Sequence, residues 1–165
     1  MFSFYNKHNN DLYNNLVEFS RNIFFYKDLG LPDKLETRIM LVFFHFSLIL
    51  IILKKKGIKI DQKIYDNIFQ NIELNMRELG HGDVSVNSKM KLLNKIFYDI
   101  LLKLDLKNTK DFKLNKNIII KHLFSGSTYN DQVLSEISSY FVNFYNFCFE
   151  LNYNIMLKGQ INFKL

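Results

Sequence analysis

Glycine and proline occur only where one helix is expected to end and the next to begin. The six glycines and the single proline are Gly30, Gly57, Gly80, Gly82, Gly126, Gly159 and Pro32. Both residue types disfavour the interior of a helix, so this placement leaves long uninterrupted segments between them. Apolar residues recur in these segments every three or four positions, as Leu12, Leu16, Phe19 and Ile23 do. The sequence therefore predicts an all-α fold.

We expect a single domain over residues 1–165, built as a bundle of about six helices with a short extended C-terminal tail. A chain of 165 residues can form one substantial core, whereas two domains of half that length would each be small. The expected segments are residues 10–26, the Asp33 cap to Lys56, the Asp61 cap to Leu79, the Ser85 cap to Leu106, 114–124, 130–151, and the tail 152–165.

Composition and the N-terminal segment suggest where the protein acts. Cys148 is the only cysteine, which rules out an internal disulfide and fits a reducing compartment. Residues 1–15 lack the apolar core of a secretory signal and the Arg-rich pattern of a mitochondrial presequence. We therefore expect a bacterial, cytoplasmic protein, either free or peripheral on the cytoplasmic face of the inner membrane.

The apolar segment from Ile39 to Leu53 raises the question of a membrane span. Its 15 residues form a helix of about 22 Å, which is short for a bilayer core of about 30 Å. Arg38 and His45 lie two helical turns apart on one face, an arrangement that is costly in lipid but acceptable inside a bundle. The segment is predicted to be a buried central helix in preference to a transmembrane one.

A polar turn is expected between the third and fourth helices. Gly80 suits the left-handed position after a helix, Gly82 frees the next bend, and Ser85 is the expected cap of the following helix. Arg38 begins an almost wholly apolar helix and therefore needs a carboxylate. We expect Asp83 to supply it, with Glu78 as the second choice.

Several segments of the chain, taken in order, carry a resemblance to a known family. They are Phe25–Asp33, Thr37-Arg38 with His45, Met76–Met90, Phe97-Tyr98, Leu123–Gly126 and Leu157–Phe163. In this order and spacing, over about Leu12 to Phe163, the chain resembles the ubiquinol-cytochrome c chaperone family, whose members assist assembly of respiratory complex III. The resemblance implies motif and client-surface residues at Arg38, His45, Arg77, Glu78, Gly80, Gly82, Asp83, Ser85 and Lys89.

The function implied by the resemblance is that of an assembly chaperone. It implies a protein that binds newly made cytochrome b, assists biogenesis of ubiquinol-cytochrome c reductase and uses no cofactor. The sequence does not reveal whether a second chaperone subunit is needed. The alternative is a peripheral membrane or RNA-associated α-helical scaffold with no role in complex III.

Catalytic and metal-binding patterns do not account for the polar residues. His45, His81 and His122 lack the carboxylate or cysteine spacing of a metal site, and we find no nucleophile elbow and no phosphate-binding glycine loop. We expect Cys148 to be a small buried apolar residue and His45 to be a hydrogen-bonded core histidine. The sequence therefore predicts a non-catalytic protein.

Lysines mark a candidate anionic-surface contact. Lys91, Lys95, Lys103 and Lys107 repeat at four residues or multiples of four on one expected helix, and the chain carries a net charge of +6. One interpretation is a solvated helix face. The other is attraction to an anionic membrane surface or to the RNA of a ribosome.

The last long helix has more aromatic residues than one core face needs. Tyr140, Tyr145, Phe147 and Phe149 lie outside the apolar seam of that helix. One interpretation is that they pack beneath the tail or in a dimer contact. The other is that they form an exposed apolar contact for a client protein.

Overall fold

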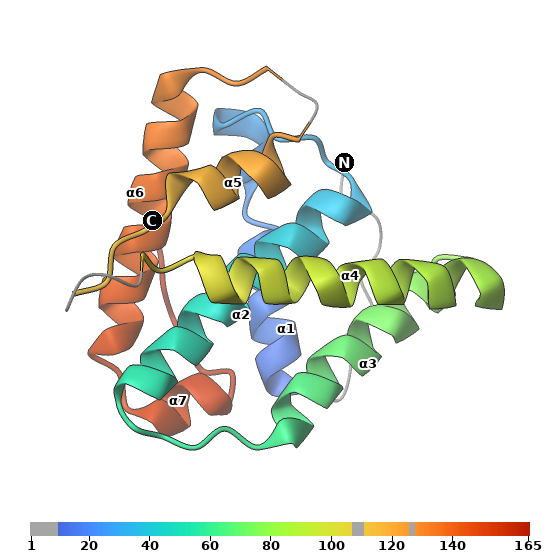
Figure 1. The fold of residues 1–165 in the computed structure, drawn as a ribbon, viewed down its shortest axis with the longest axis horizontal. Coiled ribbons are helices and arrows are strands. Elements are labelled where there is room, and N and C mark those ends of the chain that lie inside the picture. Colours follow the sequence, from blue (N-terminus) through green and yellow to red (C-terminus); the bar gives the residue numbers. More distant parts are fainter. Residues whose placement is uncertain (1–9, 107–110, 126–127) are drawn as a thin grey trace.

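The computed structural model describes residues 10–106, 111–125 and 128–165, and within them it is an all-α bundle (Figure 1). The only pairing of extended backbone in these residues is an isolated bridge between Asp105 and Leu114. The helices are α1 Asp11–Ser20, the π-helix η1 Phe24–Asp28, α2 Leu35–Lys55, α3 Gln62–Glu78, α4 Asp83–Lys103, α5 Lys116–Leu123, α6 Asp131–Phe149 and α7 Tyr153–Leu157. The predicted fold class is confirmed.

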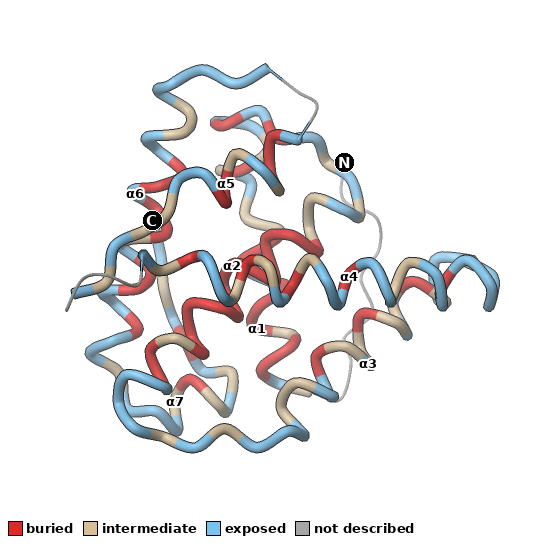
Figure 2. The backbone as a smooth tube through the Cα atoms, in the orientation of Figure 1, coloured by how far each residue is buried: buried red, intermediate tan, exposed pale blue. Residues whose placement is uncertain are grey.

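Helix α2 is the centre of the bundle. Helices α1, α4 and α6 all pack against it, and most of its length is buried (Figure 2). By length and composition α2 could cross a membrane, but 78 % of its most apolar stretch is buried inside the fold. Burial by neighbouring helices explains a helix that is apolar on all sides. The structure thus matches the buried central helix predicted from the sequence.

The first predicted helix is interrupted. Residues 10–26 were expected to form one helix, but α1 ends at Ser20 and the π-helical turn η1 begins at Phe24. The Ser20 hydroxyl donates to the carbonyl of Val17, and the Asn22 side chain accepts a hydrogen bond from the Phe24 amide. These local hydrogen bonds compete with the helix ladder. The break turns Phe25 into the core, where it is fully buried.

The tail is only partly extended. Asn152 caps α7 by accepting a hydrogen bond from the Asn154 amide, so the first part of the predicted extended tail is a short helix. The rest of the tail docks on α1. There the Asn15 side chain donates to the carbonyl of Ile161 at 3.1 Å and accepts from its amide at 3.0 Å. Asn15 therefore binds the tail through both of its amide atoms.

Candidate functional site

The α3–α4 turn forms an exposed edge of the molecule, where α3 and α4 run outward together and meet (Figure 1). Gly80 has a φ of +92°, the left-handed conformation predicted for it, and the His81 amide donates to the carbonyl of Met76. Gly82 has extended backbone and is itself the N-cap of α4. Ser85 lies inside α4, so its predicted capping role was wrong: the helix begins earlier, at Asp83.

Two sets of polar contacts brace this turn. The Arg77 guanidinium pairs with Glu73 at 3.0 Å and with Asp83, which links the end of α3 to the start of α4. Hydrogen bonds to these two carboxylates raise the pKa of Arg77, so the guanidinium stays charged. The His81 ring lies 3.2 Å from the Lys89 ammonium. Glu78 is exposed beside them.

Arg38 does not reach the turn. Its guanidinium pairs with Asp33, five residues earlier, through Nη2 at 2.8 Å and Nε at 3.2 Å. The expected pair with Asp83 was therefore wrong. So was the expected capping role of Asp33, because Lys34 is the N-cap of α2 and no side chain caps it. Burial raises the pKa of Asp33, but the hydrogen bond and charge of Arg38 outweigh that effect and lower it overall.

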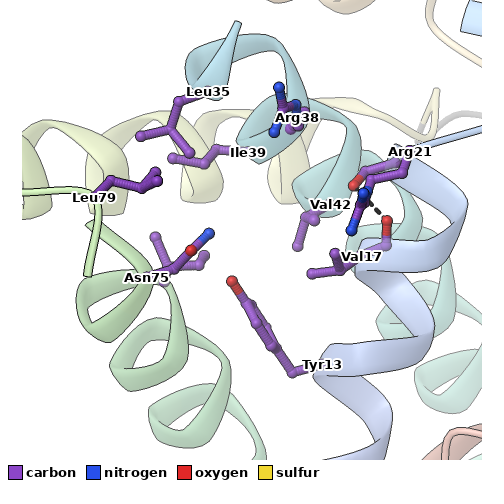
Figure 3. A pocket seen from close by; sticks show the side chains of 11 residues that line it. Tyr13, Val17, Arg21, Leu35, Arg38, Ile39, Val42, Asn75 and Leu79 are labelled. Atoms are coloured by element: carbon purple, nitrogen blue, oxygen red, sulfur yellow. Dashed lines mark hydrogen bonds between the residues drawn. The ribbon is translucent and has the colours of Figure 1, made fainter. Parts of the chain in front are cut away.

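A small hollow, the slot, lies between α1, α2 and α3 (Figure 3). Its volume is about 30 Å³, and its lining is mainly apolar with two arginines. The lining residues are Tyr13, Val17, Ser20, Arg21, Leu35, Arg38, Ile39, Val42, Ile72, Asn75 and Leu79. Pockets for small molecules typically measure roughly 300–1,000 Å³. A volume of about 30 Å³ is close to that of one water molecule or one methyl group, so the slot is too small for a cofactor.

Leu79 joins the slot to the turn. It is the C-cap residue of α3, it lines the slot opposite Arg38, and 42 % of its surface is exposed. Leu35 and Ile39 from α2 lie on the same side of the slot as Leu79 (Figure 3). The slot and the turn thus form one continuous surface, apolar at Leu79 and charged at the turn.

His45 lies in the core, away from that surface. Its Nδ1 is 2.6 Å from the Leu41 carbonyl, which can only accept, so Nδ1 carries the proton. The Tyr140 hydroxyl then donates to Nε2 at 2.8 Å. Complete burial lowers the pKa of His45 to about 4, although the Leu41 hydrogen bond opposes the shift. The structure agrees with the expected hydrogen-bonded core histidine.

The predicted lysine row is only partly available for binding. Lys91 and Lys95 are exposed on α4, whereas Lys103 pairs with Asp99 at 2.5 Å. Lys107 lies outside the described residues. Asp99 also accepts from Lys121 and pairs with His122, each at 2.7 Å. Hydrogen bonds from these partners, Lys103 first, lower the pKa of Asp99 and tie α4 to α5.

The four aromatic candidates on α6 do not form one exposed contact. Tyr140 and Tyr145 are buried, at 3 % and 6 % exposure, so their proposed role as a client surface is not supported. Phe147 and Phe149 are more than a third exposed. The Phe147 ring packs against Phe163 of the tail, and the Phe149 ring stacks on Tyr145. The packing-beneath-the-tail interpretation therefore describes Phe147 and also Tyr140, whose ring lies 5.5 Å from that of Phe163.

Other reactive groups lie apart from the slot. Cys148 is buried on α6, and burial raises the pKa of its thiol to about 12. In the described parts of the chain, no group of three or more His, Cys, Asp or Glu side chains is placed to hold a metal ion.

Sequence reasoning missed most of the slot. Arg21, Leu35, Asn75 and Leu79 come from three helices, and only the position of Leu79 next to Gly80 marked it as the end of a helix. No pattern within one segment indicates that these side chains converge. The helix packing alone brings them together.

Comparison with known proteins gave one match. A family model described as Ubiquinol-cytochrome C chaperone matches residues 27–163, which covers α2 through α7 and the last two residues of η1. The match begins at Lys27, later than the resemblance noted from Leu12. No curated protein and no solved structure matched the chain.

Proposed function

The chain belongs to the ubiquinol-cytochrome C chaperone family, and on that premise we propose that it assists biogenesis of respiratory complex III by binding newly made cytochrome b. The description of the family supports a chaperone role and supports respiratory complex III as the complex that this chaperone serves. The surface formed by the slot and the α3–α4 turn supports a protein client. We propose a cytoplasmic location, with peripheral attachment to the inner membrane.

The observation that carries this proposal is the exposed Leu79 beside the mainly apolar lining of the slot. A newly made membrane protein presents apolar helices, whose large side chains project singly from the helix surface. One such side chain would cover Leu79, and only its terminal methyl group would enter the slot. The arginines at the slot, Arg21 and Arg38, would then meet polar groups at the end of the client helix.

A contact limited to one client side chain and the residues around Leu79 is small, which suits a chaperone that must release its client. Stable protein interfaces bury roughly 1,200–2,000 Å², and smaller ones are typical of weak, transient encounters. The turn, where Arg77 pairs with Glu73 and Asp83, supplies a charged border to the apolar contact. Binding and release need no chemical step, and we propose a non-catalytic role.

The test is capture of cytochrome b by tagged protein carrying Leu79→Asp. A carboxylate at the mouth of the slot would have to lose water when the client helix covers it, which opposes binding. We expect Leu79→Asp to lower the cytochrome b recovered by about tenfold or more, since each 1.4 kcal/mol corresponds to a factor of ten in affinity.

Leu74→Asp is the matched control. Leu74 lies on the same helix, is 50 % exposed and does not line the slot. The control variant should capture cytochrome b as the parent protein does, and both variants should keep the parent melting temperature within a few degrees. Equal capture by the two variants would place the client elsewhere. Capture of no cytochrome b by the unmodified protein would contradict the proposed client.

A further inference from the structure

A second hollow, the groove, lies at the opposite end of α2 from the slot. Its volume is about 890 Å³, at the upper end of the range for ligand pockets. Leu50 and Ile51 of α2 and Leu101 of α4 are among its apolar lining residues. Arg38 and Lys54 are 16 residues apart on α2, which corresponds to about 24 Å along the helix. The slot and the groove are therefore separate surfaces.

Apolar side chains at the rim of the groove remain open to solvent. After α2 ends at Lys55, the chain runs to α3 through Ile58 and Ile60, which line the groove and are only half-buried. Leu102 of α4 also lines the groove and is 56 % exposed. Exposed apolar side chains around an apolar hollow indicate an interaction surface.

The charges at the rim are positive. Lys54, Lys55 and Lys59 line the groove together with one carboxylate, Asp105. Lys55 pairs with Asp105 at 3.0 Å and neutralises it. Lys54 and Lys59 are exposed and have no acidic partner among the described residues. The groove thus combines an apolar floor with two uncompensated cations.

Helix α4 extends this surface beyond the groove. Lys91, Lys95 and Leu102 follow one another at spacings of four and seven residues, which places them on one face of α4. All three are exposed. The face that carries Leu102 into the groove therefore also carries two more lysines along the helix.

We propose that the groove docks on an anionic lipid in a membrane surface, with an acyl chain in the apolar floor and phosphate groups against Lys54 and Lys59. Long flexible lysine stems reach lipid phosphates while their carbon chains cover apolar surface. An acyl chain has no hydrogen-bonding groups, so it suits the apolar floor of the groove. The polar side chains of the lining are Tyr65, Asp105 and the lysines. A lipid bound there leaves the slot open to a client.

Flotation with lipid vesicles tests the proposal without any client. Vesicles of phosphatidylglycerol and phosphatidylcholine present anionic head groups, and vesicles of phosphatidylcholine alone do not. We expect binding to the anionic vesicles only, weakening as salt shortens the screening length from about 10 Å at 0.1 M. Lys54→Glu combined with Lys59→Glu should lower the partition coefficient by about tenfold or more. Leu102→Asp should also lower it.

Lys27→Glu combined with Lys158→Glu is the matched control. Both lysines are exposed and distant in sequence from the groove, and the pair changes the net charge by the same amount. The control should keep binding within about twofold of the parent protein. Equal losses in the two double variants would show attraction by net charge alone and overturn the proposal. Equal binding to both kinds of vesicle would also overturn it.

The groove and the client contact fail in different ways. Suppose that the parent protein bound no vesicles and that Leu102→Asp abolished capture of cytochrome b. The groove would then be a client site, and the lipid proposal would be wrong. Loss of vesicle binding with normal capture by the same variant is the result that we expect. The slot variant Leu79→Asp should bind anionic vesicles as the parent protein does.

Discussion

At the scale of single residues, His45 is a buried neutral base held by hydrogen bonds on both ring nitrogens. Its pKa of about 4 lies below the value of 6.5 expected for an unfolded chain, because complete burial disfavours the charged ring. The unfolded chain therefore takes up a proton as the pH falls below 6.5, while the folded protein takes one up only near pH 4. Protonation favours the unfolded state in this range.

We predict that the free energy of unfolding falls by about 1.4 kcal/mol for each pH unit below 6.5, to a total of about 3 kcal/mol near pH 4. The carboxylates Asp33 and Asp99 have lowered pKa values, so their stabilising pairs are lost only below about pH 4, outside this window. Urea unfolding at several pH values measures the slope.

His45→Gln should remove most of this pH dependence, whatever its stability at neutral pH. His81→Gln, at the α3–α4 turn, removes a histidine that is not in the core and should leave the slope unchanged. An unchanged slope in His45→Gln would show that His45 is not the group responsible.

Arg38 and Asp33 form a half-buried ion pair, with side chains 16 % and 20 % exposed. A double-mutant cycle with Arg38→Ala and Asp33→Ala should give a coupling of about 1–2 kcal/mol, between the values for exposed and buried pairs. The cycle of Arg38→Ala with Asp83→Ala should be additive within about 0.5 kcal/mol. Chemical unfolding measures both, and coupling found in the second cycle alone would contradict the pairing.

At the scale of elements, the C-terminal tail is held on α1 by a close backbone approach. Gly159 has a φ of +67°, and a Cβ at this position would overlap the backbone carbonyl of Asp11. The approach lets the Asn15 side chain reach Ile161. Only glycine satisfies both requirements.

We predict that Gly159→Ala lowers the free energy of unfolding by about 3 kcal/mol, which combines backbone strain with the overlap on α1. Gly57→Ala is the matched control, because Gly57 has a similar φ of +71° but open space where a Cβ would lie. It should cost about 1 kcal/mol, from strain alone. Equal losses in urea unfolding would show that the tail does not depend on this approach.

Some helix ends were predictable from sequence because their signals are local, whereas the end of α1 and the starts of α2 and α4 were not. The left-handed Gly80 lies within one turn of the helix that it ends, and Asn130 caps α6 through the Val133 amide three residues away. The contacts that organise the interior are not local. The His45 ring and the Tyr140 hydroxyl are 95 residues apart, and Asn15 and Ile161 are 146 apart. Periodicity within a segment carries no information about such pairs.

The error at Arg38 has the same origin. The sequence showed that this residue needs a carboxylate, but the choice of partner depends on where α2 begins. With Lys34 as the N-cap, the Asp33 carboxylate is free of a capping role and folds back on Arg38. The slot and the groove were missed because each is formed by three or more segments that only the tertiary packing brings together.

At the scale of the whole molecule, the slot and the groove lie toward opposite ends of α2. The slot and the α3–α4 turn form the proposed client surface, and the groove with its lysines forms the proposed membrane contact. A single buried helix connects the two hollows, so the distance between them is fixed by the fold. We propose that cytochrome b in particular is the client of this protein.

Deletion of the gene, followed by quantification of cytochrome b and of each respiratory complex, tests this proposal. We predict that cytochrome b and complex III fall together while the other complexes keep their normal levels. The unmodified gene should restore complex III, whereas the Leu79→Asp gene should not. Unchanged cytochrome b in the deletion strain would show that cytochrome b is not the client.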